Sequence, residues 1–252
     1  MNDILIWELD CKIYALNDLP LQNSGENTAN LVDIALVKDE KFYKFHKRNI
    51  LKPYVVSIPK NISPDFKVIK KGERVNFKIR TVNRYLNDYL LENILNVSND
   101  NFKVIFITSK KIQYRHLEYI RSITPVNLSI ENKYWRDTKM EEEEAILKLI
   151  NNLCKKCLRF IGKDYGVFTK DTMNIVLKDY KVLNSFPLYT PYKGKKLKGD
   201  KFELRLQDNI IAQDLGKIAL GCGLGLKNPR AFGFTTNYNK VNNYGKKINK
   251  YF

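Results

Sequence analysis

The alternation of apolar and polar residues predicts an N-terminal half built of strands and two helices. A first strand with one buried face is indicated by apolar residues at every second position, namely Leu5, Trp7, Leu9, Cys11 and Ile13. The pattern then predicts, in chain order, a helix over 28–47 with a break near 38–40, strands over 54–58 and 74–82, a helix over 84–95 and a strand over 102–108.

The same order of elements begins again in the second half. We expect a strand over 126–130, a helix over 139–161, a strand over 202–206, a helix over 208–220 and a strand over 232–235. Thr138 and Glu141 predict a capping box at the start of the long helix, and Gly162 ends it. The acidic residues at 141–144 suit the helix N-terminus, and its last turn has the basic residues Lys155, Lys156 and Arg159.

Two successive βαββαβ units define the expected fold. In a ferredoxin-like domain, two split β-α-β units make one antiparallel sheet with helices on one face. We therefore predict an α+β protein of two tandem ferredoxin-like (RRM-like) domains, the first over residues 1–122 and the second over residues 123–252.

Charge and aromatic content point to a polyanion as the partner. The 252 residues include 44 Lys and Arg against 27 Asp and Glu, a net charge of +17. The last 63 residues hold 13 Lys and Arg against 4 Asp and Glu, so they carry +9 of this charge. Such an excess attracts polyanions, and the 15 Tyr and 13 Phe could stack bases. The alternative is an AT-rich genome, which raises the content of Lys, Asn, Ile and Tyr.

The strand over 74–82 combines an apolar face with a basic one. Apolar residues occupy alternate positions, while Arg74, Lys78 and Arg80 share the opposite face. A sheet with one side open to a polyanion would have this pattern. An ordinary solvated outer face explains it equally well.

Neither a metal, a cofactor nor a membrane is predicted as a partner. Cys154 and Cys157 lie three residues apart on the long helix and are expected to pack as small apolar groups. A zinc site needs four ligands, but Cys11 and Cys222 are single and distant. No apolar run reaches the roughly 18 residues that span a bilayer, and the N-terminus lacks a signal-peptide pattern, so we expect a cytoplasmic protein.

A glycine-rich stretch follows the last predicted helix. Gly223, Gly225 and Gly233 enclose Lys227 and Arg230. Glycine lets backbone N–H groups approach a phosphate closely, and the cations add charge. The stretch precedes a strand and lacks G-K-[ST], unlike dinucleotide-binding and Walker loops. The pattern predicts a loop that cradles a polyanion, with a tight helix-to-strand turn as the alternative.

This stretch resembles the G-φ-G…G-φ-G loop of the CRISPR-associated repeat-RNA-processing endoribonucleases, in the repeat-associated mysterious protein superfamily. Ala231 stands where that loop has a glycine. Residues 42–46 with 52–57 resemble the family's helix end and strand around the catalytic histidine. Residues 152–156 resemble its NL-x-x-K helix, and 198–204 the strand before its last helix. The matches follow the family's order and imply two tandem ferredoxin-like domains.

The resemblance also implies an activity and a site. His46 and Lys52 correspond to catalytic residues, and Tyr43, one turn before His46, is a candidate third group, although the family's tyrosine lies further upstream. Histidine transfers protons near neutral pH, and lysine stabilises phosphoryl oxygens. The implied reaction is metal-independent cleavage of CRISPR repeat transcripts into guide RNAs, by 2′-OH attack that leaves 2′,3′-cyclic phosphate and 5′-OH ends. Contacts with the RNA are expected from Gly223, Gly225, Lys227, Arg230, Gly233, Arg74, Lys78 and Arg80.

The expected partners are repeat RNA, as precursor and product, and other subunits of a CRISPR effector complex. Two alternatives stay open. A non-catalytic RNA-binding subunit of the same superfamily would share the fold and the loop. An unrelated basic structural protein, such as a ribosome-associated factor, would lack a reason for the ordered glycine loop.

Overall fold

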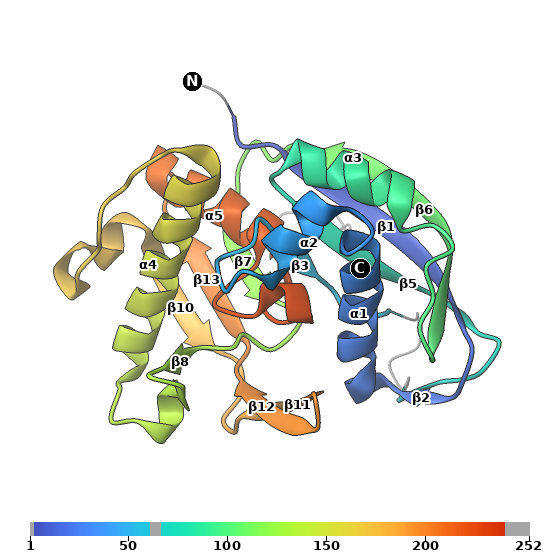
Figure 1. The fold of residues 1–252 in the computed structure, drawn as a ribbon. Coiled ribbons are helices and arrows are strands. Elements are labelled where there is room, and N and C mark those ends of the chain that lie inside the picture. The colour runs from blue at the N-terminus through green and yellow to red at the C-terminus, as the bar shows by residue number, and fades with distance from the viewer. Residues whose placement is uncertain (1–2, 61–66, 240–252) are drawn as a thin grey trace, which may run out of the picture.

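Two antiparallel four-stranded sheets organise the computed structural model, which describes residues 3–60 and 67–239 (Figure 1). The first sheet has the order β3-β5-β1-β6. Its strands are β1 (Ile6–Ala15), β3 (Tyr54–Val56), β5 (Arg74–Thr81) and β6 (Phe102–Ile112). The helices of this N-terminal unit are α1 (Ser24–Leu36), α2 (Glu40–Lys47) and α3 (Arg84–Asn93). The first and third strands of the βαββαβ unit are central, which confirms a ferredoxin-like fold.

The second sheet has the equivalent order, β10-β13-β7-β14, and completes the tandem fold. Its strands are β7 (Tyr119–Ser122), β10 (Leu177–Val182), β13 (Phe202–Leu206) and β14 (Thr235–Tyr238). The helices of this C-terminal unit are α4 (Glu142–Ile161) and α5 (Ile210–Cys222). Cys154 and Cys157 are buried in its core, as predicted.

In the part of the chain that the structure describes, several short elements lie outside the two main sheets. Three pairs of strands lie outside the main sheets: β2 (Leu19–Pro20) with β4 (Val68–Ile69), β8 (Ser129–Ile130) with β9 (Lys133–Tyr134), and the hairpin of β11 (Leu188–Tyr192) and β12 (Lys195–Gly199). Four 3-10 turns are η1 (Leu21–Asn23), η2 (Trp135–Asp137), η3 (Lys170–Ile175) and η4 (Asn228–Arg230). Within residues 3–60 and 67–239, no helix is long and apolar enough to cross a bilayer.

Several element boundaries differ from the sequence prediction. The helix expected over 28–47 begins earlier, at Ser24. Its expected break near 38–40 is confirmed, because Asp39 caps a second helix, α2, by accepting from Phe42 N. Residues 126–127 do not enter the second sheet, since they form isolated bridges to Asp200 and Leu226. The first strand of that sheet is β7, so the units are joined at 113–118, upstream of the expected boundary at 122.

The predicted start of the long helix was also wrong. Helix α4 begins at Glu142, and Glu141 is its N-cap without a side-chain hydrogen bond. Thr138 is taken up by the preceding turn, where its hydroxyl donates to the Trp135 carbonyl. The strand expected over 232–235 starts three residues later, at Thr235, because the residues before it close the glycine loop.

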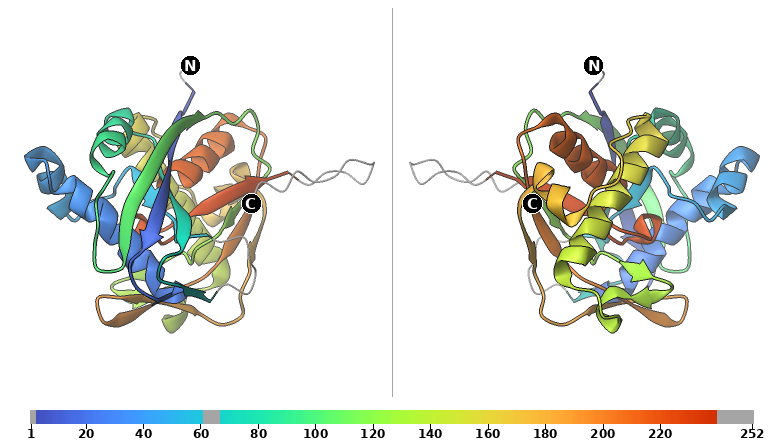
Figure 2. Two further views of the ribbon diagram at one scale, coloured as in Figure 1. Left: turned by 90° about the vertical axis from the view of Figure 1, so that its right-hand side faces the viewer. Right: turned by 90° about the vertical axis from the view of Figure 1, so that its left-hand side faces the viewer.

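Both faces of β1 are covered at its start. Leu9, Cys11 and Ile13 face the core as predicted, but Ile6 and Glu8 are buried as well. Helix α5 of the C-terminal unit packs on the sheet face opposite α1 and α3 (Figure 2). It approaches so closely that a Cβ added at Gly221 would lie 2.6 Å from Val82. The start of the first strand is therefore buried on both faces. The alternation of apolar and polar residues predicted only one buried face.

The buried Glu8 ties this contact together electrostatically. Burial raises the pKa of Glu8, but Arg80 and Lys78, each 2.7 Å away, bring it down to about 2. Arg80 also donates to the Thr235 carbonyl at 2.7 Å and lies over the Phe234 ring. Arg80 thus joins the two sheets, and it does not lie on an open basic face as predicted.

A buried lysine fixes the glycine loop, residues 223–233. Lys156 Nζ donates to the carbonyls of Gly223 and Gly225 at 2.7 and 2.9 Å, and to Asn228 Oδ1 at 2.8 Å. Its side chain is fully buried, and burial lowers its pKa to about 8. The sequence predicted a role for Lys156 at the helix C-terminus, but its ammonium group bonds to the glycine loop. An ammonium group is tolerated there because three oxygens replace water.

Replacing Lys156 with methionine should therefore destabilise the protein. The apolar stem keeps its volume, but three buried oxygens lose their donor, which costs about 3 kcal/mol. We expect Lys156→Met to lower the thermal midpoint by about 6–12 °C, measured by circular dichroism. The exposed neighbour Lys155 provides the control, and Lys155→Met should melt like the unchanged protein. Equal midpoints for both variants would contradict this role.

Candidate active site

His46 lies near the end of α2, a helix held at both ends by side chains. Asp39 caps the start. At the other end, Lys52 Nζ donates to the carbonyls of Phe45, His46 and Arg48, the last two at 3.2 and 3.0 Å. Lys52 therefore acts first as a cation at a helix C-terminus, where it satisfies free carbonyls. It fixes the backbone that carries His46.

The imidazole of His46 meets a carboxylate from α1 and a cation from the C-terminal unit. His46 Nδ1 lies 3.3 Å from Asp33 Oδ1, and the other carboxylate oxygen, Oδ2, is hydrogen-bonded by Arg230 Nη1. About four-fifths of each of these three side chains is buried. Arg230 ends η4 in the glycine loop, which lies in red between α1 and α4 in Figure 1. The cluster therefore exists only where both units meet.

The surroundings of His46 favour its neutral form. Burial lowers its pKa, Asp33 opposes this, and the cations Arg230, Lys52 and Lys193 lower it further. A neutral imidazole has one nitrogen free to accept a proton. Lys52 is affected in the same way: burial, with Arg230, Arg159 and Arg48, brings its pKa to about 8. Both groups can exchange protons near neutral pH.

The hairpin of β11 and β12 completes the site from the C-terminal unit. Lys193 and Gly194 have positive φ values of 48° and 71°, which form its tight turn. The Lys193 N–H donates to Glu26 Oε1 on α1 at 2.9 Å, so the turn docks on the N-terminal unit. Beside it, the Tyr192 ring centroid is 5.8 Å from the Arg230 guanidinium carbon.

Sequence reasoning missed Asp33, Tyr192 and Lys193. None belongs to a motif with His46. Asp33 lies on α1, and Tyr192 and Lys193 lie in the hairpin of β11 and β12. The structure gives Tyr43 a different setting from Tyr192, because its side chain is exposed and the Lys47 ammonium lies 4.3 Å from its ring centroid. Tyr192, and not Tyr43, thus has its ring beside the Arg230 guanidinium.

The three predicted loop glycines serve the fold. Gly223, Gly225 and Gly233 are buried with φ values of 78°, 65° and 64°. A Cβ at Gly223 would lie 2.5 Å from Asn228 Nδ2, and one at Gly225 would lie 2.7 Å from the Asn127 carbonyl oxygen. The tight-turn interpretation therefore accounts for the glycines. Lys227, in contrast, is exposed.

The other predicted RNA contacts differ in how accessible they are. Arg74 is exposed at the start of β5, and Lys78 is half-buried in its pair with Glu8. Arg80 is buried. His116, the second histidine, lies in the connection between the sheets, with Nε2 3.5 Å from Asp208 Oδ1, and its side chain is 47% exposed. It belongs to a different surface from the His46 cluster.

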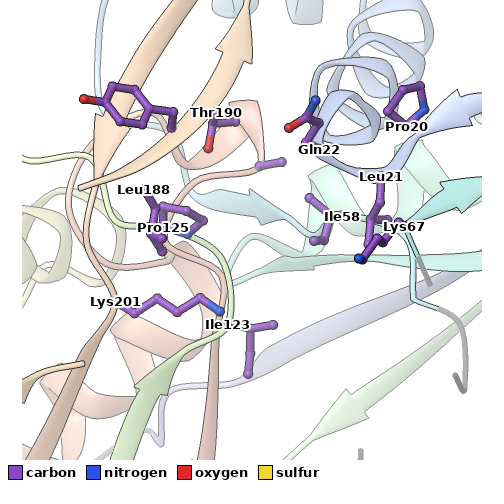
Figure 3. Close-up of a pocket in the computed structure, with 12 residues that line it drawn as sticks. Pro20, Leu21, Gln22, Ile58, Lys67, Ile123, Pro125, Leu188, Thr190 and Lys201 are labelled. Carbon is purple, nitrogen blue, oxygen red and sulfur yellow. The ribbon is translucent and has the colours of Figure 1, made fainter. Parts of the chain in front are cut away.

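A cavity of about 550 Å³ opens at the same junction (Figure 3). Its walls include Leu188 and Pro125 from the C-terminal unit and Ile58 from the N-terminal unit. Lys67 and Lys201 lie at its edges, and burial lowers the pKa of Lys201, with Arg121 adding to the effect. An apolar hollow edged by two cations suits a ligand with a flat apolar part and a negative charge.

Comparison with known proteins shows the fold. No family model and no curated protein matches the chain. Among solved structures, a "CRISPR associated protein Cas6" is 16% identical, with a TM-score of 0.67, over 93% of this chain and 100% of that one. A Cas6-related protein from Pyrococcus furiosus is 15% identical, with a TM-score of 0.65, over 93% and 99%. A Cas6 product complex is 13% identical, with a TM-score of 0.62, over 94% and 100%. The resemblance seen in the motifs is thus confirmed for the fold of nearly the whole chain.

The two cations of the glycine loop should behave differently on substitution. Lys227→Ala should leave the melting temperature unchanged and reduce the salt dependence of single-stranded RNA binding, by about 0.7 in the log–log slope if it contacts one phosphate. Arg230→Ala should lower stability by about 1–3 kcal/mol, because Asp33 loses its partner in a mostly buried place. Fluorescence anisotropy and thermal melts measure both. A wild-type salt slope for Lys227→Ala would remove the exposed lysine from the interface.

Proposed function

We propose that the chain is a metal-independent endoribonuclease that cleaves CRISPR repeat transcripts into guide RNAs. The observation that carries the proposal is His46, with a lowered pKa, held among Lys52, Lys193 and Arg230 at the junction of the units. The shared fold supports it, because the similar structures include Cas6 proteins and a Cas6 product complex. Basic, junction-spanning surfaces also suit an extended nucleic acid.

The geometry suits attack by the RNA's own 2′-hydroxyl. Neutral His46 takes the proton of the 2′-OH, and the oxygen forms a bond to the adjacent phosphorus. The bond from phosphorus to the 5′ oxygen breaks, and that oxygen takes a proton from an acid, for which Lys52 is our candidate. Arg230 and Lys193 lie where they can stabilise the negative phosphoryl oxygens. The products are a 2′,3′-cyclic phosphate and a 5′-OH.

The cavity gives the strand a second place to bind. Tyr189 lines it and is 56% exposed, so a base could stack on its ring. Lys67 and Lys201 could then neutralise the flanking phosphates. RNA would then follow the junction past Ala231 and Arg230 of the glycine loop, and contacts to phosphates would position it without reading sequence.

A non-catalytic RNA-binding role is the second candidate. It is favoured by the hydrogen bonds of Lys52, whose ammonium is committed to three main-chain carbonyls. It is also favoured by the exposed position of Tyr43. A protein with this arrangement could hold repeat RNA without cutting it. Cleavage assays separate the two.

Cleavage of the repeat RNA encoded beside the gene should proceed in excess EDTA. The 3′ end of the upstream product should be a 2′,3′-cyclic phosphate, identified by mass spectrometry. A single 2′-deoxy substitution just upstream of the scissile phosphate should abolish cutting, because it removes the nucleophile. That substrate should still bind, since one hydroxyl is a small part of a phosphate-dominated interface. Tight binding of the unmodified repeat without any product would favour the non-catalytic role.

The two histidines form a matched pair for locating the site. His46→Ala should slow single-turnover cleavage by roughly 10²-fold or more, since a positioned acid or base contributes about 10²–10⁴. RNA affinity should stay near wild type. His116→Ala should cut at the wild-type rate, because its surface lies elsewhere. If His116→Ala were inactive and His46→Ala cut at the wild-type rate, the active site would lie at the connection between the sheets, and the protein would still be an endoribonuclease.

A further inference from the structure

Asp33 lies between the histidine of the site and a cation from the other unit. We propose that Asp33 is a positioning residue for His46, and that Arg230 of the C-terminal unit holds Asp33 in place for this task. The inference rests on the proposed function for its catalytic consequence. The contact itself can be tested without RNA.

The two oxygens of Asp33 are used unequally. Oδ2 accepts a hydrogen bond from Arg230 Nη1. Oδ1 is buried and accepts no hydrogen bond from the described residues, although His46 Nδ1 lies 3.3 Å away. A buried acceptor without a donor costs about 1–3 kcal/mol. A proton on Nδ1 and a small rotation of the ring would remove that cost, so Asp33 favours the Nδ1–H form of His46.

That form is the one the reaction needs. With its proton on Nδ1, a neutral imidazole presents Nε2 as the free acceptor for the 2′-OH proton. When Nε2 has taken the proton, the ring is positive, and the carboxylate beside Nδ1 stabilises it. A carboxylate that orients a histidine and stabilises its imidazolium does the same in hydrolases with a serine nucleophile. Asp33 would act here without touching the substrate.

Arg230 makes this arrangement depend on contact between the units. It lies in the glycine loop, which Lys156 fixes from within the C-terminal unit. Asp33 belongs to α1 of the N-terminal unit. Its burial raises its pKa, and Arg230 and His46 oppose that rise. Arg230, which the docked C-terminal unit provides, thus favours the charged form of Asp33 beside His46, and separation of the units would remove this contact.

Several charged groups around Asp33 and His46 determine the direction in which the pKa of His46 shifts. Lys52, Lys193 and Arg230 each lower the pKa of His46, whereas Asp33 raises it. The hydroxyl of Tyr54 is fully buried near Asp33 and Arg230, and Asp33 adds to the rise in its pKa. Removing the Asp33 charge should therefore lower the pKa of His46.

The first test is a proton NMR titration of the RNA-free protein. The chain has two histidines, so two imidazole resonances are assigned by substituting each in turn. Asp33→Asn should move the His46 titration to lower pH, and this shift should become smaller in an Arg230→Gln background if Arg230 holds Asp33 in place. Asp208→Asn is the matched control, since Asp208 lies 3.5 Å from His116, and it should leave His46 unchanged.

The second test follows cleavage against pH under single-turnover conditions. Asp33→Asn should reduce the rate by about tenfold or more, but less than His46→Ala does, with RNA affinity near wild type. The limb of the profile that reports His46 should move to lower pH whether His46 is the base or the acid. A purely structural role would lower the rate and leave the limb in place.

The outcomes separate the two proposals. An unchanged His46 titration in Asp33→Asn overturns the positioning role, whether or not the protein cuts RNA. Shifted titrations in a protein that never cuts support the contact and overturn the proposed reaction. If Asp33→Asn does not fold, nitrogen NMR of His46 in the unchanged protein decides instead, and a neutral ring with its proton on Nε2 overturns the inference.

Discussion

The ammonium group of Lys156 is stable inside the C-terminal unit only because Gly223, Gly225 and Asn228 turn three oxygens toward it. This constraint determines the shape of the glycine loop. Carbonyls that point inward require the positive φ values seen at Gly223 and Gly225, and the close approach to Asn127 leaves no room for a side chain. The contacts with the buried Lys156 are therefore sufficient to explain these glycines, without a bound phosphate.

The rest of the site follows from that loop. Its fixed shape places Arg230 against Asp33 of the other unit, and Asp33 in turn faces Nδ1 of His46. Helix α5 and Arg80 hold the same two units together on the opposite face of the N-terminal sheet. Two separate contacts thus fix the positions of α1, α2 and the loop relative to one another. Side-chain contacts across the junction therefore assemble the site, although no helix or strand of the described residues crosses it.

Sequence patterns predicted what depends on local spacing. The tandem ferredoxin-like fold followed from alternation and helical periodicity. The resemblance to the family's motifs selected His46 and Lys52, which the structure brings together at the end of α2. The patterns did not predict the burial of residues that are covered by distant parts of the chain. Ile6 is buried against α5, Glu8 is buried beside Arg80, and Lys156 is buried by the loop, although each looks ordinary in its own element. Asp33 carried no signal because its partners, His46 and Arg230, lie on two other elements.

The net charge of +17 also takes a different meaning once the pairs are known. Arg80 is neutralised by Glu8 and Arg230 by Asp33, and Lys156 is buried, so these cations hold the protein together. Attraction to a polyanion has to come from exposed groups such as Lys227 and Arg74. In the proposed function, long-range attraction would therefore come from exposed cations and proton transfer from the mostly buried His46 cluster.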